Sequence, residues 1–224
     1  MHRRVAHPAW ALGAACLVIG LGAFAANPGS WRAATPMPIE RTEVAAAALG
    51  GKIYVVGGFK SFFIGGVTNA VQEYDPAVNR WRDRAPLPEP LHHTAAAALD
   101  GKLYVIGGYR DLWPWKPMAT VWRYDPATDR WEARRPMPTA RGGIAAVALG
   151  GRLFVFGGEE SAGTFAQTEV YDPAANRWTA MTAMPTARHG LGAAVVGGNI
   201  FVIGGGVKPG ASRSNLNEVF DPNL

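Results

Sequence analysis

The sequence predicts an all-β protein built from four copies of one four-stranded unit, and two independent markers carry this prediction. A run that ends in two glycines, GKIYVVGG at its first occurrence, recurs with its glycine pairs beginning at Gly57, Gly107, Gly157 and Gly204, in steps of 50, 50 and 47 residues. Tryptophans recur with the same three steps, at Trp31, Trp81, Trp131 and Trp178. Two markers that keep one period indicate a repeat protein.

Residues 90–135 show how one unit is built. Thr94–Leu99 is a short run of small apolar residues, Asp100 and Gly101 are typical of a tight hairpin turn, and Lys102–Ile106 predicts a second strand. After the glycine pair and a variable segment, Thr120–Tyr124 and the residues around Trp131 predict two more strands, joined by an Asp-Pro turn. Four short antiparallel strands in about 50 residues are typical of one β-propeller blade.

The glycine pair that closes the second strand, followed by a tyrosine and seven residues later by a tryptophan, resembles the kelch repeat. The resemblance runs from about Trp31 to Pro222 and implies a kelch-type β-propeller, similar to the central domain of galactose oxidase and of an exported bacterial type. Kelch propellers serve many roles, so it implies a fold and not a function. The repeat positions are Gly57, Gly58, Tyr74, Trp81, Gly107, Gly108, Tyr124, Trp131, Gly157, Gly158, Tyr171, Trp178, Gly204 and Gly205.

The units predict four blades of four strands, at residues 39–83, 89–133, 139–180 and 186–222. The last unit lacks a fourth strand, whereas the segment around Trp31 matches a fourth strand with no strands before it. We therefore expect residues 30–34 to complete the last blade and close the ring. Two alternatives stay open, namely a fragment of a six-bladed propeller and an eight-bladed ring of two chains.

Residues 1–25 predict an export signal. Arg3 and Arg4 precede an almost wholly apolar run, and Ala23 and Ala25 supply the small residues of a cleavage site. The alternative is an uncleaved anchor that leaves the rest of the chain outside the membrane. We expect residues 26–224 to form the propeller domain of a secreted or periplasmic protein, with membrane contact only if the segment is uncleaved.

Charge and cysteine content argue against several functions. The formal net charge of +5 includes no basic cluster, so we expect no nucleic-acid partner. The single cysteine, Cys16, lies in the predicted signal, so the mature chain would lack the cysteine that a galactose-oxidase-type copper centre needs. His92 and His93 are adjacent on a predicted strand and point to opposite sides. We expect no metal and no cofactor.

Strand direction divides the loops between two faces. The connections between blades and the loops between second and third strands share one face, and the Asp-Pro and Gly turns share the other. The turn-bearing face repeats in every blade, which indicates a structural role. The other face varies, and binding residues are expected on variable loops of a fixed frame.

Three arginines stand at one repeat position at the start of the predicted innermost strands, where Leu91 interrupts the series. In kelch propellers that bind acidic peptides, arginines at the matching place contact the ligand. The equally open alternative is that they bond backbone carbonyls between blades. Trp113 and Trp115 lie outside the repeat pattern and suit stacking on a sugar or a peptide, or else cover the rim of the propeller itself. The candidate ligand-binding residues are Arg41, His92, Arg110, Trp113, Trp115, Arg141, Glu159, Arg188 and His189.

We therefore expect an exported, non-enzymatic propeller that binds a protein or glycan ligand through its variable loops. The alternative is a carbohydrate-active enzyme that resembles the sialic-acid epimerases. No residue is assigned a catalytic role.

Overall fold

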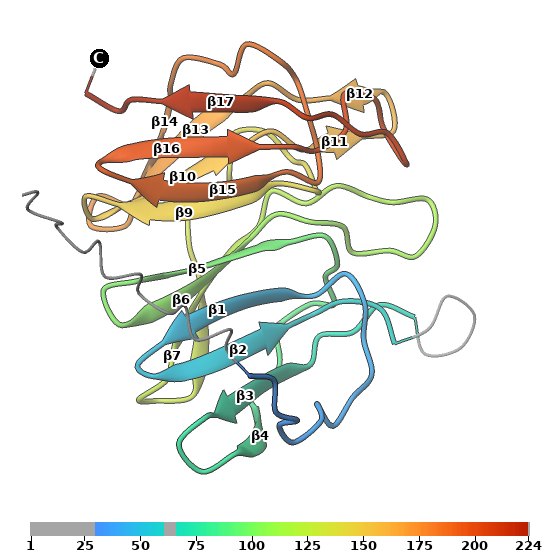
Figure 1. Cartoon of the computed structure of the whole chain (residues 1–224), viewed down its shortest axis with the longest axis vertical. Helices are drawn as coiled ribbons and strands as arrows, with labels where there is room; N and C mark the ends of the chain where they lie inside the picture. Colours follow the sequence, from blue (N-terminus) through green and yellow to red (C-terminus); the bar gives the residue numbers. More distant parts are fainter. Residues whose placement is uncertain (1–29, 61–65, 224) are drawn as a thin grey trace, which may run out of the picture. The chain divides into compact units, whose positions relative to one another are not determined.

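Each repeat of the sequence forms one antiparallel sheet in the computed structural model, which describes residues 30–60 and 66–223 (Figure 1). The first blade contains β1 (Ala45–Leu49), β2 (Lys52–Val56), β3 (Val71–Asp75) and β4 (Arg80–Arg84). The second contains β5 (Ala95–Leu99), β6 (Lys102–Ile106), β7 (Val121–Asp125) and β8 (Arg130–Ala133). The third contains β9 (Ala145–Leu149), β10 (Arg152–Phe156), β13 (Thr168–Asp172) and β14 (Arg177–Ala180), and the fourth β15 (Gly192–Val196), β16 (Asn199–Ile203) and β17 (Asn217–Phe220).

The predicted four-bladed all-β fold is confirmed. Strands follow one another in chain order within each blade, so the innermost strand is the first of its repeat. These innermost strands lie beside one another, β1 by β5, β5 by β9 and β9 by β15. Their Ala- and Gly-rich sequences fit this place, because small side chains let neighbouring sheets approach closely near the axis. One small hairpin, β11 (Glu159–Glu160) with β12 (Gly163–Thr164), is added outside the repeat pattern.

The cores of the protein lie between blades. Tyr104 and Ile106 of the second blade pack against Leu153, Val155 and Tyr171 of the third. The corresponding positions form the cluster between the first and second blades and the cluster between the third and fourth. Each blade is therefore stabilised by apolar side chains on both of its faces, provided that it has a neighbour on both sides.

The glycine pairs are required where one blade meets the next. Gly107 and Gly108 have φ angles of 57° and 99°, which favour glycine. A Cβ on Gly107 would lie 2.7 Å from the carbonyl oxygen of Arg141, and one on Gly108 would lie 2.6 Å from that of His92. The Gly108 N–H also donates to the Arg141 carbonyl (3.0 Å). The repeated glycines are thus the contact point of the following blade.

The fourth blade differs from the prediction. Its sheet has three strands, β15, β16 and β17, and residues 30–36 form no strand. The prediction that the segment around Trp31 completes this blade is therefore wrong for the described residues. The chain after Trp31 is instead held at the first blade, because the Thr35 N–H and hydroxyl donate to Asn79 and the Thr35 carbonyl accepts from the Trp81 indole (2.8 Å).

The predicted export signal, residues 1–25, lies outside the described residues. The chain divides into a unit of residues 1–33 and a unit of residues 34–224, and the blades belong to the second. Residues 30–60 and 66–223 contain no helix with the length and hydropathy needed to cross a bilayer.

Candidate functional site

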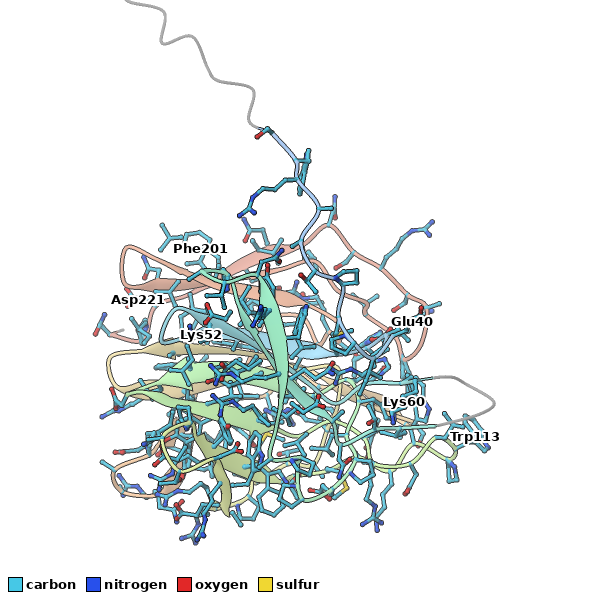
Figure 2. The ribbon with its side chains drawn as sticks, turned by 90° about the horizontal axis from the view of Figure 1, so that it is seen from below. Glu40, Lys52, Lys60, Trp113, Phe201 and Asp221 are labelled. Atoms are coloured by element: carbon cyan, nitrogen blue, oxygen red, sulfur yellow. The ribbon has the colours of Figure 1, made fainter. Side chains whose placement is uncertain are left out.

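The variable loops of the second unit gather on one face, as predicted. In every blade, the residue three positions before the innermost strand pairs with the residue after the glycine pair, as in the bridges His92–Tyr109 and Gly142–Glu159. Strand entries and the loops between second and third strands therefore share one side, which we call the loop face. Figure 2 shows Lys60 and Trp113 on this side and Lys52 and Asp221, at the turns, on the opposite side.

The turn face carries the same bond in each blade. The Asp of each Asp-Pro pair accepts the backbone N–H two residues later, at 3.0 Å for Asp75, Asp125 and Asp172 and at 2.8 Å for Asp221. In the first three blades, such an Asx turn closes the link from third to fourth strand. The turn face is thus occupied by structural bonds, as its repetition predicts.

The three candidate arginines point into the blades. Arg141 is fully buried, and its guanidinium donates to the carbonyls of Gly157 (2.7 Å) and Thr139 (3.1 Å) and to Glu169 (2.6 Å). Burial lowers the pKa of Arg141, and the Glu169 carboxylate opposes this shift. Because every guanidinium nitrogen is removed from solvent, Arg141 stabilises its blade and is not available on the loop face.

Arg188 and Arg41 have the same role in their own blades. The buried Arg188 donates to the Gly204 carbonyl (2.6 Å) and to Glu218 (2.7 Å). Arg41, which is half-buried, donates to the Gly57 carbonyl and the Gln72 side chain, both at 2.9 Å. These arginines thus bond backbone carbonyls, as the alternative has it, but the carbonyls belong to the arginine's own blade and do not lie between blades. We leave all three out of the site.

The pairing of these arginines escaped the sequence analysis, although the repeats carry a signal for it. Their side-chain partners come from one position of the third strand, which holds Gln72, Glu169 and Glu218. In the second blade that position holds Trp122, and the arginine is replaced by Leu91. The arginine and its polar partner are lost together, which indicates a contact within the blade.

His92 is also buried, in a cluster of rings beneath the loop face. Its ring centroid lies 4.2 Å from that of Phe59 and 5.3 Å from those of Tyr109 and Trp115. Burial lowers the pKa of His92 to about 4. This histidine is neutral near pH 7 and supports the floor of the loop face from below, out of reach of a ligand.

One pocket of about 510 Å³ opens on the loop face. Its walls come from three blades and consist of Tyr109, Trp113, Pro114, Trp115, Glu159, Glu160, Ser161, Pro209 and Gly210. The Trp113 side chain is 85% exposed, whereas Trp115 is half-buried and its ring stacks 5.1 Å from that of Tyr109. We call this the loop-face pocket.

Glu159 is the best-held polar group of the loop-face pocket. Its Oε1 lies 3.2 Å from His189 Nδ1, and its Oε2 accepts the Gly210 N–H at 2.9 Å. Its backbone carbonyl accepts the Tyr109 hydroxyl at 2.7 Å. Burial and the Glu159 carboxylate raise the pKa of Tyr109. These bonds fix one wall of the pocket across three blades, so the pocket is largely preformed.

The structure thus brings together some of the predicted residues and separates others. Trp113, Trp115 and Glu159 line the pocket, and His189 contacts Glu159 from behind. Arg110 lies near Asp111 (3.7 Å) at the start of the same loop and is not among the lining residues. Ser161, Pro209 and Gly210 were not predicted, because no repeat pattern specifies which loop positions reach the pocket, and Glu160, an acidic residue expected on this face, was not among the candidate ligand-binding residues.

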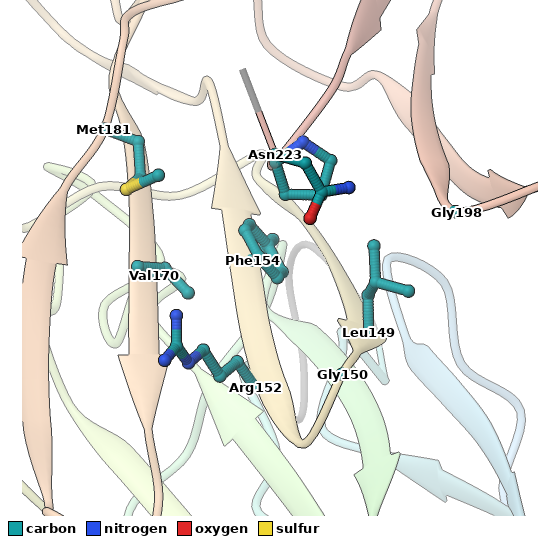
Figure 3. Close-up of a pocket in the computed structure, with 9 residues that line it drawn as sticks. Leu149, Gly150, Arg152, Phe154, Val170, Met181, Gly198 and Asn223 are labelled. Carbon is teal, nitrogen blue, oxygen red and sulfur yellow. The ribbon is translucent and has the colours of Figure 1, made fainter.

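A second cavity, of about 280 Å³, lies between the third and fourth blades and is lined by Leu149, Phe154 and Met181 among others (Figure 3). In the clusters between the other blades, Trp131 and Leu49 pack against one buried cluster and Trp178 and Leu99 against another. Leu149 has no such tryptophan in its cluster. This cavity is therefore explained by the missing fourth strand of the last blade.

No three His, Cys, Asp or Glu side chains meet in a metal-binding arrangement within the described part of the chain. His93 lies 3.3 Å from Glu43, and His92 Nδ1 lies 2.7 Å from His93 Nδ1. The prediction that the two histidines lie on a strand and point to opposite sides is therefore wrong: β5 begins only at Ala95, and the two rings contact each other beside a carboxylate.

Comparisons with known proteins agree with this architecture. The family model of the Attractin/LZTR1 β-propeller matches residues 23–224. Among solved structures, the structure of YjhT is similar with a TM-score of 0.69 and 20% sequence identity, over 79% of this chain and 63% of that one. The chain thus spans less than two thirds of the length of YjhT, and at this identity the likeness shows the fold alone. A search of curated proteins finds no match.

Proposed function

The chain belongs to the Attractin/LZTR1 β-propeller family, and we propose that it is a binding module whose loop-face pocket holds a carbohydrate ligand. One observation carries this proposal: two tryptophans that lie outside the repeat pattern, together with the buried Tyr109, line one cavity with two carboxylates. Aromatic faces stack on the apolar faces of sugar rings, and carboxylates accept hydrogen bonds from sugar hydroxyls.

The size of the pocket supports this ligand class. A volume of about 510 Å³ falls within the range of small-molecule sites, roughly 300–1,000 Å³. It is suited to one or two sugar rings. The strongly exposed Trp113 stands at the entrance, where a further ring of a longer glycan would stack.

The charge of the pocket selects among sugars. Glu159 and Glu160 line it together, and no lysine or arginine is among its lining residues. A carboxylated sugar would meet like charge in a partly desolvated site. We therefore propose neutral sugars or amino sugars as ligands, in preference to acidic ones.

The test is a glycan array that carries neutral, amino and acidic glycans, followed by calorimetric titration of the best ligand. We expect neutral or amino glycans to bind and Trp113→Ala to weaken binding roughly tenfold or more, with an unchanged Tm. The matched control is Val78→Ala, which shortens an exposed side chain in a turn of the opposite face. Binding that survives Trp113→Ala, a preference for acidic glycans, or capture of peptides but no glycan would each contradict the proposal.

A further inference from the structure

Neighbouring blades are connected by one recurring set of four backbone hydrogen bonds. Between the second and third blades, Met137 N–H donates to the Ala119 carbonyl (2.8 Å) and Arg141 N–H to that of Met118 (3.2 Å). Gly108 N–H donates to the Arg141 carbonyl (3.0 Å), and Gly143 N–H donates to that of His93 (2.9 Å). We call this set the blade joint.

The blade joint occurs three times in the chain. Between the first and second blades it comprises Leu87 N–H to Asn69, Leu91 N–H to Thr68, Gly58 N–H to Leu91 and His93 N–H to Glu43. Between the third and fourth blades it comprises Met184 N–H to Ala166, Arg188 N–H to Phe165, Gly158 N–H to Arg188 and Gly190 N–H to Gly143. Three copies of one bond set show which backbone groups a blade offers on each side.

Within the part of the chain that the structure describes, the two end blades each present one half of this joint without a partner. Within residues 30–60 and 66–223, no hydrogen bond engages the groups of the first blade that match the joint, which are the N–H of Met37, Arg41 and Glu43 and the carbonyl of Arg41. The same holds for the matching groups of the fourth blade, which are the carbonyls of Asn215, Ser214 and Gly190 and the N–H of Gly205. Three donors and one acceptor thus face outward at one end, and three acceptors and one donor at the other.

The apolar surfaces repeat this complementarity. Ile203 of the fourth blade is 49% exposed, whereas its counterparts Ile106 and Phe156 are fully buried against the following blade. Ile53 of the first blade is 38% exposed, whereas its counterparts Leu103 and Leu153 are fully buried against the preceding blade. The faces that form cores elsewhere are therefore open at both ends.

The two open faces do not meet within one chain. The first and fourth blades lie at opposite ends of the second unit, with β4 and β17 far apart along its long axis (Figure 1). Among the described residues of a single copy, no group satisfies these backbone donors and acceptors, which are costly to leave unpaired where an apolar surface excludes water.

We propose that copies of this chain associate head to tail, with the fourth blade of one copy forming a blade joint with the first blade of the next. The occupant of each open face is a second copy, because a copy carries the complementary half of the joint in the same register that the chain uses three times internally. A contact of this kind is heterologous, and its smallest closed form is a ring of two copies. This inference is independent of the proposed carbohydrate site.

The test is the solution mass of the purified chain by sedimentation velocity over a range of concentrations. We expect a dimer or larger species for the wild type. Ile203→Glu and Ile53→Glu, which place a charge on the fourth-blade and first-blade faces, should each weaken self-association roughly tenfold or more. Val78→Glu, which charges an exposed valine of a turn, is the matched control and should associate like the wild type.

Mixing the two variants tests the head-to-tail arrangement itself. Ile203→Glu keeps an intact first-blade face and Ile53→Glu keeps an intact fourth-blade face, so a one-to-one mixture should form a heterodimer that neither variant forms alone. Circular dichroism of each variant confirms that the blades are folded. A monomeric wild type, or an oligomer that both variants leave intact, would overturn the proposal. Failure of the mixture to associate would overturn the head-to-tail contact.

Discussion

The arginines inside the blades and the tryptophans of the loop-face pocket were equal candidates for ligand binding, yet the structure places them in opposite environments. Arg141 occurs at a repeated position, is fully buried and is bonded to Glu169. Trp113 occurs outside the repeat and is largely exposed. In a repeat protein, recurrence at one register therefore marks residues that build the frame, and departure from it marks residues that are free to bind.

The strongest test of this difference is the loss of a buried arginine. Arg141→Ala leaves the Glu169 carboxylate buried without its cation, which costs about 3–5 kcal/mol of unfolding free energy. Urea denaturation measures the change. Arg41→Ala serves as the milder comparison, because its side-chain partner is the neutral Gln72 and the expected loss is about 1–3 kcal/mol. A loss of ligand binding by Arg141→Ala at unchanged stability would reverse the assignment.

His92 lies between these two cases, because its position differs among the four repeats and yet its side chain is buried. Its pKa is lowered by burial to about 4 in the folded protein, against about 6.5 in an unfolded chain. The unfolded state therefore binds a proton first as the pH falls below about 6.5, and stability declines until about pH 4. We expect His92→Phe to remove up to about 3 kcal/mol of this decline between pH 7 and pH 4.5, measured by urea denaturation at both values. An identical pH dependence in wild type and variant would show that His92 titrates normally.

A repeated tryptophan, Trp131, and a loop tryptophan, Trp113, allow the same comparison within one residue type. Trp131 stacks on Tyr124 (4.9 Å between ring centroids) and donates its indole N–H to the Ala85 carbonyl (2.8 Å). We expect Trp131→Ala to lower the unfolding free energy by about 2–3 kcal/mol, less than for a fully buried tryptophan. Thermal and urea unfolding measure the effect. An unaffected variant would mean that the repeated tryptophans contribute little to the frame.

Trp113→Ala is expected to have the smallest effect on stability. Its side chain is mostly in solvent, so the change should stay within about 0.5 kcal/mol. Differential scanning calorimetry beside Trp131→Ala makes the contrast direct. A substantial loss of stability would indicate that the loop around Trp113 supports the rim of the propeller.

The fold was predictable because two markers kept one period, and the four blades follow from that period alone. The strands of the second blade were predicted to within about one residue, as for β6 over Lys102–Ile106, whereas the strand predicted around Trp31 does not form. The roles of the arginines could not be predicted from their position in the repeat, because a side chain at the start of the innermost strand can point either to the loop face or into the blade. A signal was nevertheless available in the comparison of the four repeats. In the second repeat Leu91 stands in the place of Arg41, Arg141 and Arg188, and Trp122 stands in the place of their polar partners.

The loop-face pocket could be predicted only in part. Trp113 and Trp115 stood out because the blades do not need them, and Glu159 because it follows a glycine pair. Pro209 and Gly210 reach the same pocket from the fourth blade. Their approach depends on the conformation of a loop with no repeat partner, and no pattern in the sequence encodes it.

The bridge between His92 and Tyr109 has a practical consequence for protein engineering. Below residues 110–116, the backbone is clamped by the bonds from Arg110 N–H to the Lys116 carbonyl (3.3 Å) and from Met118 N–H to the Gly108 carbonyl (2.8 Å). The segment between these hydrogen bonds is a short loop whose two ends are held in place. This segment bonds to the frame below it through the contact of His92 Nε2 with the backbone carbonyl of Asp111 (3.2 Å), which a graft of any sequence can keep. Randomised segments grafted between Arg110 and Lys116 would therefore be displayed on a stable frame, which makes this position suited to libraries of new binders.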